Sequence, residues 1–314
     1  MKIVQQSADI LVESKNPMKH IERIGRICYK SEDKMCEGSD KKFIKMLYCK
    51  GHYAMLEHFR FIFQVNESLY DALSSIRPKH VIMTNYDRHV ISFNATALMN
   101  LDRDCSKDNE VNVLIARSIK EELISHIVRI FDCYELFGID RDDRLPLLST
   151  SVCPIKNDAG KMSQEEWNMH GWMSVHMITD RGITHEIVRH REETSFAQES
   201  TRYCNYSHDR HGNEITIINQ GFHGEILNLW FNAMECAEST YFKLLNLGVM
   251  PQMARSVLPT CLKTEIVMTA PIYEWEHFFD LRLRGTTGAP HPLIKDLSKM
   301  IYNQLTLHDK QRRI

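Results

Sequence analysis

Hydrophobic and polar positions recur along this chain with two periods, one typical of strands and the other of amphipathic helices. Residues 58–65 alternate cleanly, with phenylalanines on one face and with His58 and Arg60 on the other. The aromatic face is expected to pack in the core, which leaves His58 and Arg60 for the opposite face. Looser patterns predict further strands at 2–12, 173–177, 214–219 and 264–269.

Helices are predicted from capping residues and from hydrophobic positions spaced three to four residues apart. Asn16 and Pro17 suit the start of a helix that runs to about Tyr29. Ser163 and Glu166 form a capping-box pattern at the start of another helix. Further helices are expected at about 40–50, 67–76, 110–136 and 225–247, and after Pro251, Pro271 and Pro292. Residues 140–160, rich in Asp, Pro and Ser, are expected to form a loop.

Composition is that of an ordinary soluble globular protein. The 314 residues are 43% hydrophobic and 25% charged, which is enough for a substantial core. The formal net charge of −2 excludes the broad basic field of a general nucleic-acid binder, so any phosphate site must be local. The sequence has no signal-peptide core and no apolar run of membrane-spanning length. A cytoplasmic protein without nucleic-acid or membrane partners is therefore expected.

Cysteine and histidine spacing gives little support for thiol or metal chemistry. Nine cysteines, an odd number without a Cys-x-x-Cys pair, favour reduced thiols over disulfides or a structural zinc site. None is expected to be catalytic, and Cys204 is the first to test. His208-x-x-His211 is the closest histidine pair, but it lacks a second pair of ligands, so no metal is expected.

A basic cluster is the most informative segment of the chain. The residues before it predict a turn and a short helix, on which Glu186 and His190 would be neighbours at i, i+4. Arg189, Arg191 and Arg202 supply three guanidiniums within a few turns of chain. Such cations repel one another unless an anion lies between them, and arginine suits bidentate capture of phosphate. The alternative is a solvated basic helix end that complements the helix dipole.

These residues resemble the signature of the flavin-dependent thymidylate synthases. Arg189-His190-Arg191 followed by Ser200-x-Arg202-Tyr203 matches the family's pattern, and Arg181–Glu186 is similar to its lead-in. Three further blocks stand in the family's order, at Gly51–Phe61, at Ala254–Pro259, and at Glu274–Arg282 followed by Ala289–Pro292. There are departures. Eight residues instead of seven precede Ser200, Gln198 replaces a Glu, and Pro271-Ile272-Tyr273 replaces Asn-Ala-Arg.

The resemblance implies an α+β fold with a twisted sheet flanked by helices. It also implies a homotetramer whose active sites lie at subunit interfaces. The chain is expected to form a single catalytic domain over residues 1–314, interrupted by a largely helical insertion at about 66–171. The sequence does not indicate what this insertion does.

The implied activity is reductive methylation of dUMP to dTMP in thymidylate biosynthesis. 5,10-Methylenetetrahydrofolate would supply the carbon, FAD would carry the hydride, and NADPH would reduce the flavin. Arg282 is expected to be catalytic, because a fixed cation beside the pyrimidine promotes ionisation at N3. Residues implied for dUMP binding are Glu186, Arg189, Gln198, Glu199, Ser200, Thr201, Arg202, Arg255 and Arg282. Residues implied for FAD binding are His58, Arg60, Arg189, His190, Arg191, Gln198, Tyr273, His277 and His291, the last at the flavin or folate edge.

Two other functions stay open from the sequence. A family member that is inactive or has changed its substrate would bind flavin or nucleotide, and would purify yellow without making dTMP. A nucleic-acid-binding module built on the basic cluster would show salt-dependent binding, although the near-neutral net charge weakens this alternative. For individual residues, Arg255 and Arg282 could be ordinary surface or helix-end cations, and His277 and His291 could be structural.

Overall fold

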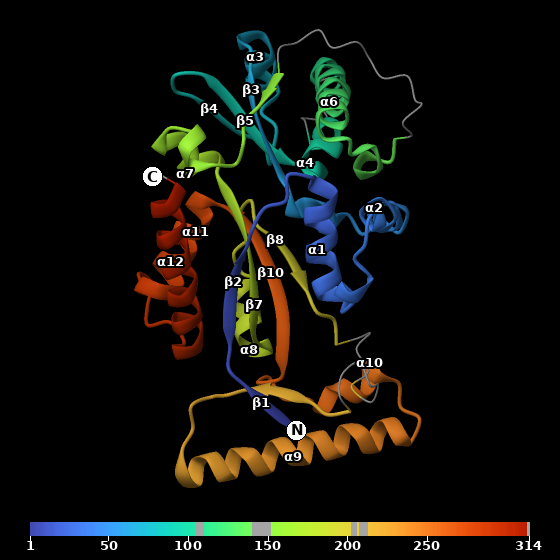
Figure 1. Ribbon diagram of the computed structural model, residues 1–314, viewed down its shortest axis with the longest axis vertical. Helices are drawn as coiled ribbons and strands as arrows, with labels where there is room; N and C mark the ends of the chain where they lie inside the picture. Colours follow the sequence, from blue (N-terminus) through green and yellow to red (C-terminus); the bar gives the residue numbers. More distant parts are fainter. Residues whose placement is uncertain (105–109, 140–151, 202–205, 207–212, 313–314) are drawn as a thin grey trace.

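Three sheets organise the described part of the chain into a mixed architecture of helices and strands, in agreement with the expected class (Figure 1). The computed structural model describes residues 1–104, 110–139, 152–201, 206 and 213–312, without the side chains of 307–312. The central sheet has the order β2 (Ser7–Leu11), β7 (Trp172–Asp180), β10 (Lys263–Pro271) and β8 (Ser195–Gln198). The upper sheet has the order β4 (Ile82–Asn85), β5 (His89–Asn94), β3 (Arg60–Val65) and β6 (Val152–Pro154). A parallel pair joins β1 (Lys2–Val4) to β9 (Thr216–Ile218).

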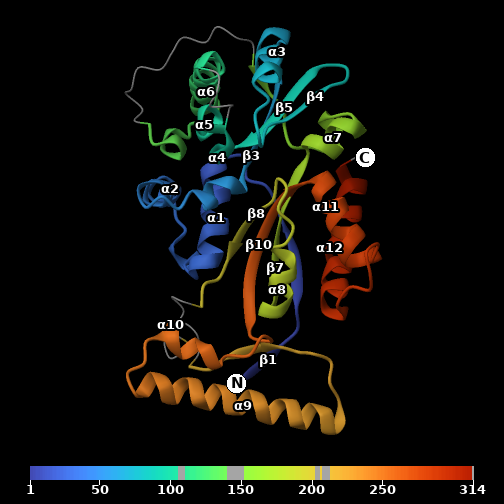
Figure 2. The ribbon, with the colours of Figure 1, turned by 180° about the vertical axis from the view of Figure 1, so that it is seen from behind.

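Helices cover both faces of the central sheet. Their bounds are α1 Pro17–Tyr29, α2 Ser39–Cys49, α3 Glu67–Ile76, α4 Ala95–Met99, α5 Leu101–Asp104, α6 Glu110–Phe131, α7 Gln164–His170, α8 Arg181–Ile187, α9 Gly224–Asn246, α10 Pro251–Ala254, α11 Ile272–Phe279 and α12 Pro292–Arg312. Figures 1 and 2 show α11 and α12 on one side of the central sheet, and α1 and α2 on the other. The same views have α3 and α6 beside the upper sheet, and α9 and α10 below the central one. Within the described residues, no helix combines the length and the apolar character needed to cross a membrane.

Capping residues fix the helix ends that the sequence predicts. The Asn16 side chain accepts hydrogen bonds from the backbone amides two and three residues ahead, at 2.8 and 3.2 Å. α1 ends at Lys30, whose backbone adopts a positive φ of 50°. The capping box of Ser163 and Glu166 is also present at the start of α7. Both predicted helix starts are therefore confirmed.

β7 and β10 form the longest strand pair of the protein. They run antiparallel over nine residues each, from Lys263 opposite Asp180 to Pro271 opposite Trp172. One core cluster contains the inward-facing side chains of both strands together with apolar residues of α8, α11 and α12. These three helices therefore cover the same face of the central sheet.

The first predicted strand is wrong in one respect, because residues 2–12 form two strands instead of one. β1 pairs with β9 whereas β2 pairs with β7, so the chain changes sheets at residues 5–6. The Gln6 side chain lies at this change, where its amide donates to the Leu293 carbonyl at 2.9 Å and its oxygen accepts from Thr179 at 3.3 Å. Alternation alone does not record which strand becomes the partner.

Two other predicted elements have different bounds. The strand expected from His58 begins at Arg60, because residues Tyr53–His58 form a 3₁₀-helix. The helix expected over 110–136 ends at Phe131, and the next residue takes a positive φ of 49°. Both differences lie at element ends, where local backbone geometry overrides side-chain periodicity.

His170 joins α7 to the upper sheet through buried hydrogen bonds. Its Nε2 lies 2.7 Å from Thr84 Oγ1 on β4, and its Nδ1 lies 2.8 Å from Ser92 Oγ on β5. The imidazole is fully buried, and this burial together with the charge of Arg60 lowers its pKa to about 4. The ring is therefore neutral at physiological pH.

The contribution of His170 to the free energy of unfolding should decrease when the pH is lowered. Because the pKa of His170 is lower in the folded than in the unfolded chain, its contribution is complete above about pH 6.5 and is lost as the pH falls towards 4. Urea unfolding of wild-type protein should therefore show a loss of up to about 3 kcal/mol from this residue between pH 7 and pH 4. His170→Gln should be less stable at pH 7 but show a shallower decline over this range. Equal pH slopes for the two proteins would contradict the assignment.

Candidate active site

A cavity of about 610 Å³ opens where the turn after α8 meets α11. Six residues that the sequence predicts for the site line it, and they come from segments about 90 residues apart, namely Arg189, His190, Arg191, Tyr273, His277 and Arg282. Glu192, Glu274 and Leu281 complete the lining. This candidate active site therefore combines the basic cluster with the last of the matching blocks and the residue before it.

Local structure explains why the basic cluster faces the cavity. Asp180 caps α8 by accepting a hydrogen bond from the Ile183 amide at 2.7 Å, and the helix ends at Ile187. The chain then turns, which leaves Arg189 and Arg191 exposed and His190 buried. Because the helix is this short, the predicted i, i+4 contact between Glu186 and His190 along it is wrong.

Arg282 connects these two residues instead. Its Nη1 donates to Glu186 Oε2 at 2.8 Å and its Nη2 donates to the Glu186 carbonyl at 3.1 Å. Its Nε donates to His190 Nε2 at 3.2 Å. Arg282 lies in a π-helical turn, Asp280–Arg284, that continues α11. The guanidinium is thus held in one orientation from three directions.

His190 is a neutral acceptor in this arrangement. Burial lowers its pKa to about 4, and the nearby charges of Arg282 and His277 act in the same direction. The His277 ring lies edge-on to it with centroids 5.7 Å apart. The fixed positive charge at this wall of the cavity therefore belongs to Arg282.

Glu274 is a site residue that the sequence did not predict. It lines the cavity although its side chain is only 5% exposed. Burial, together with the neighbouring carboxylates of Glu192 and Glu193, raises its pKa to about 7. Its position as the first residue of the last matching block, Glu274–Arg282, was the signal that could have indicated it.

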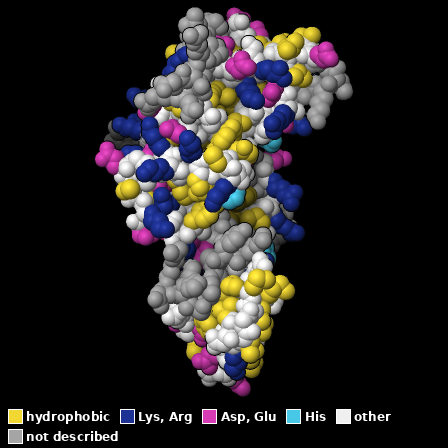
Figure 3. Space-filling view, turned by 90° about the vertical axis from the view of Figure 1, so that its right-hand side faces the viewer, with side chains coloured by type: hydrophobic (Ala, Val, Ile, Leu, Met, Phe, Trp, Pro, Cys, Tyr) yellow, Lys and Arg dark blue, Asp and Glu magenta, His cyan; other side chains and the backbone are white. Residues whose placement is uncertain are grey.

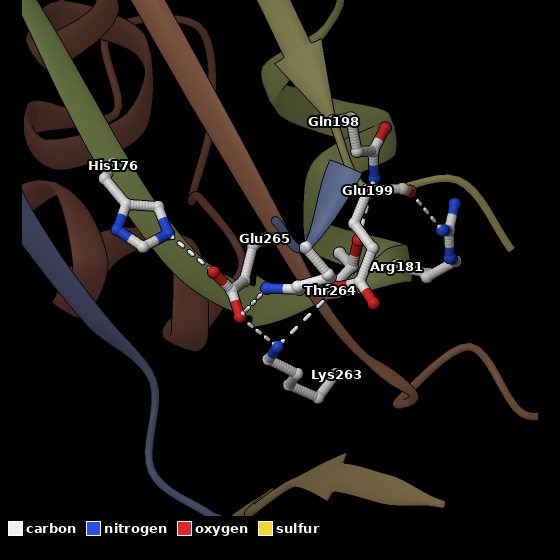
Figure 4. A network of polar contacts seen from close by, with 8 residues as sticks. His176, Arg181, Gln198, Glu199, Lys263, Thr264 and Glu265 are labelled. Carbon is white, nitrogen blue, oxygen red and sulfur yellow. Dashed lines mark hydrogen bonds and ion pairs between the residues drawn. The ribbon is translucent and has the colours of Figure 1, made fainter. Parts of the chain in front are cut away.

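A second cluster gathers predicted substrate residues at the other end of α8 (Figure 4). The Gln198 amide donates to Thr184 Oγ1 at 2.9 Å, and Arg181 donates to the Glu199 carbonyl at 2.7 Å. Arg255, exposed in the 3₁₀ turn after α10 and not within the helix predicted for it, donates to Thr201 Oγ1 at 3.0 Å. Arg181 and Glu186 are five residues apart on one helix, so their backbone positions lie about 8 Å apart along the axis of α8.

A buried charge network holds this second cluster in place. Figure 4 has His176 and Lys263 pointing towards Glu265, and His176 Nε2 lies 2.9 Å from its carboxylate. Lys30 and Lys263 both pair with Glu265 and lie within 4.0 Å of Glu199. Burial alone would raise the pKa of Glu265, but the hydrogen bond from His176 and the two ammonium groups hold it well below its usual range. Its residues lie at the end of α1, on β7 and on β10. Because these segments are far apart in the sequence, the sequence did not predict the network.

The remaining predicted residues lie outside the cavity lining. His58 is buried and shares a hydrogen bond of 2.7 Å with Thr269, while Arg60 pairs with Glu193 at 2.9 Å. His291 is exposed at the start of α12, where its Nδ1 accepts from the Leu293 amide. Ser200 is half-buried next to Glu199. Five residues singled out in the sequence lie outside the described residues, namely Arg202, Tyr203, Cys204, His208 and His211.

Neither a disulfide nor a metal cluster is found within the described part of the chain. Its cysteines are free, as the sequence predicts. Among the residues that the structure describes, no group of three or more His, Cys, Asp or Glu side chains could hold a metal ion.

Comparison with known proteins identifies the family. The profile of the family described as thymidylate synthase complementing protein matches residues 10–86 and 161–306. Together these segments make up well over half of the chain. The chain therefore belongs to the thymidylate synthase complementing protein family.

Individual relatives agree with this family over part of their length. The flavin-dependent thymidylate synthase of Pyrococcus furiosus is 35% identical over 105 residues, which is 33% of this chain and 42% of that protein. That of Geobacter sulfurreducens is 31% identical over 151 residues, 48% of this chain and 64% of its own. The match thus spans less than half of the Pyrococcus protein. A solved UMP/dUMP methylase PolB from Streptomyces cacaoi, bound with 5-Br dUMP, aligns with 98% of this chain and 93% of its own at 13% identity. At a TM-score of 0.41, this likeness does not establish a shared fold.

The Glu265 network should be a strong stability determinant. Glu265→Ala removes the carboxylate closest to Lys30 and Lys263 and leaves them only the more distant Glu199 among their present partners. Breaking a buried ionic network in this way typically costs about 3–5 kcal/mol. Glu265→Gln should cost less, because it keeps an acceptor for His176. Denaturant unfolding at pH 7 measures both, with exposed Glu225→Ala on α9 as the control.

The stability lost in Glu265→Ala should depend on pH in a defined direction. Because the pKa of Glu265 is lowered on folding, its contribution is present above about pH 4.5 and is lost as the pH falls further. The stability difference between wild type and Glu265→Ala should therefore shrink below that pH. A difference that stays constant down to pH 3 would contradict the network.

Proposed function

We propose that this protein is a flavin-dependent thymidylate synthase that converts dUMP to dTMP with 5,10-methylenetetrahydrofolate, FAD and NADPH. The observation that carries the proposal is the fixed Arg282 guanidinium in a cavity that also presents Arg189 and Arg191. Membership of the family, and relatives named as flavin-dependent thymidylate synthases, support the same activity. FAD would supply the hydride when bound.

The donor set of the cavity fits an anionic dinucleotide. Arg189 and Arg191 are exposed and have no ion pair among the described residues, so their guanidiniums are available to phosphate oxygens. His190, His277 and Tyr273 would contact the ring system beside them. The same cavity carries Glu192 and Glu274, which distinguishes it from the flat basic surface that nucleic-acid binding requires.

The second cluster is suited to the nucleotide substrate. Gln198, Glu199, Ser200 and Thr201 lie on β8 and directly after it, held against β10 by the Glu265 network. Arg255 adds an exposed guanidinium beside Thr201, which suits a monophosphate. A separation of about 8 Å along α8 would let a nucleotide reach from this cluster towards Arg282.

Arg282 would act on the pyrimidine as a preorganised cation. Its three hydrogen bonds to Glu186 and His190 fix its direction before substrate arrives, so no reorganisation is needed when negative charge develops at N3. Neutral His190 leaves this charge to Arg282 alone.

Assembly into a homotetramer is part of the proposal. Tyr241 is the one buried residue of α9, all of which the structure describes. Ile226 and Leu229 on this helix are 64% and 74% exposed, and Leu247 directly after it is 81% exposed. Figure 3 shows hydrophobic side chains gathered at the lower end of the molecule, over this layer. An apolar surface of this kind marks a protein interface. The insertion at about 66–171 would add most of the upper sheet to the single catalytic domain.

The direct test is the visible spectrum of the purified protein before and after NADPH is added without air, followed by an assay of dTMP formation. Arg191→Ala should purify largely colourless, because the flavin phosphates lose a principal counter-charge. The matched control is Arg284→Ala, an exposed arginine outside the cavity lining that pairs with Asp280 and Glu276. A fully yellow Arg191→Ala protein would contradict the assignment of this residue, and yellow wild-type protein that makes no dTMP would favour an inactive family member.

Arg282 should serve chemistry more than binding. Arg282→Ala should keep its flavin, be reduced by NADPH and bind dUMP, yet lose about 100- to 1000-fold in the rate of dTMP formation, or roughly 2.7–4 kcal/mol. Arg282→Lys should recover little, since a compact ammonium group lacks the planar fork with which the guanidinium bonds Glu186 and His190. Single-turnover assays beside calorimetric dUMP binding make this measurement. Near-normal turnover with weakened dUMP binding would instead make Arg282 a phosphate ligand.

A further inference from the structure

Glu274 occupies an unusual position for an ionisable side chain. It is 95% buried, yet it lines the candidate active site. No hydrogen bond or ion pair of its side chain occurs among the residues that the structure describes. Glu276, two residues further along α11, is exposed and pairs with Arg284. Neither carboxyl oxygen of Glu274 is among the fully buried, unpaired polar atoms of the described residues, so the carboxyl group opens to the cavity. A ligand bound there would supply the hydrogen-bond partner that the described residues do not.

The charges around Glu274 come from every element that packs near it. The turn after α8 contributes Glu192 and Glu193, and Glu193 is already paired with Arg60 and His80. The cationic side of the cavity and the neighbouring helix α7 contribute Arg189, His190, Arg191, His277, Arg282, Glu165, Glu166 and His170. Glu166 and His170 are occupied by Arg88, Thr84 and Ser92. The described part of the cavity therefore has one buried carboxyl group that is not neutralised.

We propose that Glu274 accepts the N–H donor of a heterocycle bound in the cavity, as a specificity-determining residue of the proposed activity. The chemistry it selects is a ring N–H flanked by carbonyl or amino groups. The isoalloxazine of FAD, the uracil of dUMP and the pterin of the folate each present such an edge. This inference rests on the proposed function, and it assigns a role to a residue outside the predicted set.

Charge also determines how such a ligand is oriented. A carboxylate repels phosphate, whereas Arg189 and Arg191 attract it, so the two walls of the cavity sort the ends of a nucleotide. The ring would lie towards Glu274 and Tyr273, and the phosphates towards the arginines. Tyr273 and Glu274 are adjacent at the start of α11, which gives both a backbone position fixed by the end of β10.

Proton release is the signature of this contact. In the free protein the pKa of Glu274 is about 7, because burial and two nearby carboxylates disfavour its charge. An N–H donor favours the ionised form and lowers that pKa, so binding at pH 7 should release about half a proton from this group. The affinity for the recognised ligand should rise about tenfold between pH 6 and pH 8.

Calorimetry in two buffers of different ionisation enthalpy measures the released protons directly. FAD would be titrated into the flavin-free full chain, and dUMP or tetrahydrofolate into the FAD-loaded protein, at pH 6, 7 and 8. The variants are Glu274→Gln, which keeps the size of the side chain, and Glu276→Gln as the control on the same helix. Protons released by phosphate groups are common to all three proteins and cancel in the difference.

For one of the three ligands, wild type and Glu276→Gln should release about half a proton more at pH 7 than Glu274→Gln does. The ligand that shows the difference is the one that Glu274 recognises. Equal proton release by all three proteins would overturn the inference while leaving the proposed function intact, provided that the wild type forms dTMP. Wild-type protein that binds none of the ligands would overturn both. If Glu274→Gln does not fold, a wild-type affinity that stays constant from pH 6 to pH 8 for every ligand would still overturn it.

Discussion

The antiparallel pairing of β7 with β10 is the constraint on which the site depends. β7 leads into α8 at one end of the pair, and β10 leads into α11 at the other. Since both helices pack on the same face of the sheet, each runs back towards the other. The Met173 carbonyl accepts a hydrogen bond from the Trp275 indole at 3.2 Å, which fixes α11 on β7 directly. A shift in the register of β7 and β10 would separate Arg282 from Glu186 and His190. Arg282 follows β10 in the chain, whereas its two partners follow β7.

α8, although only seven residues long, connects the cluster around Glu199 to the cavity. Its first residue, Arg181, bonds the Glu199 carbonyl, and its sixth, Glu186, holds Arg282. One helical turn and a half thus sets the distance between the cluster around Glu199 and the cavity. A rigid element is well suited to this purpose, because a loop of the same length would let the two clusters move independently.

Sequence predicted local features well and long-range features through the family resemblance alone. The helix caps at Asn16 and Ser163 could be predicted from the sequence because a cap depends on residues within one turn. Arg189, His190 and Arg191 were readable because their charges stand side by side in the chain. Lys30, His176 and Glu265 were not, since they are brought together by sheet pairing and by the end of α1. The split of the first strand at Gln6 depends on tertiary contacts in the same way.

Glu193 links the wall of the cavity to the upper sheet. It adopts a positive φ of 50°, and its carboxylate pairs with Arg60 on β3 and with His80 before β4. These two ion pairs hold the turn that carries Glu192 against the upper sheet, so the turn and the sheet should move together. Residues outside the cavity lining therefore help to determine its shape. Substitutions in the upper sheet can change which ligand the cavity prefers while every residue of the signature stays the same.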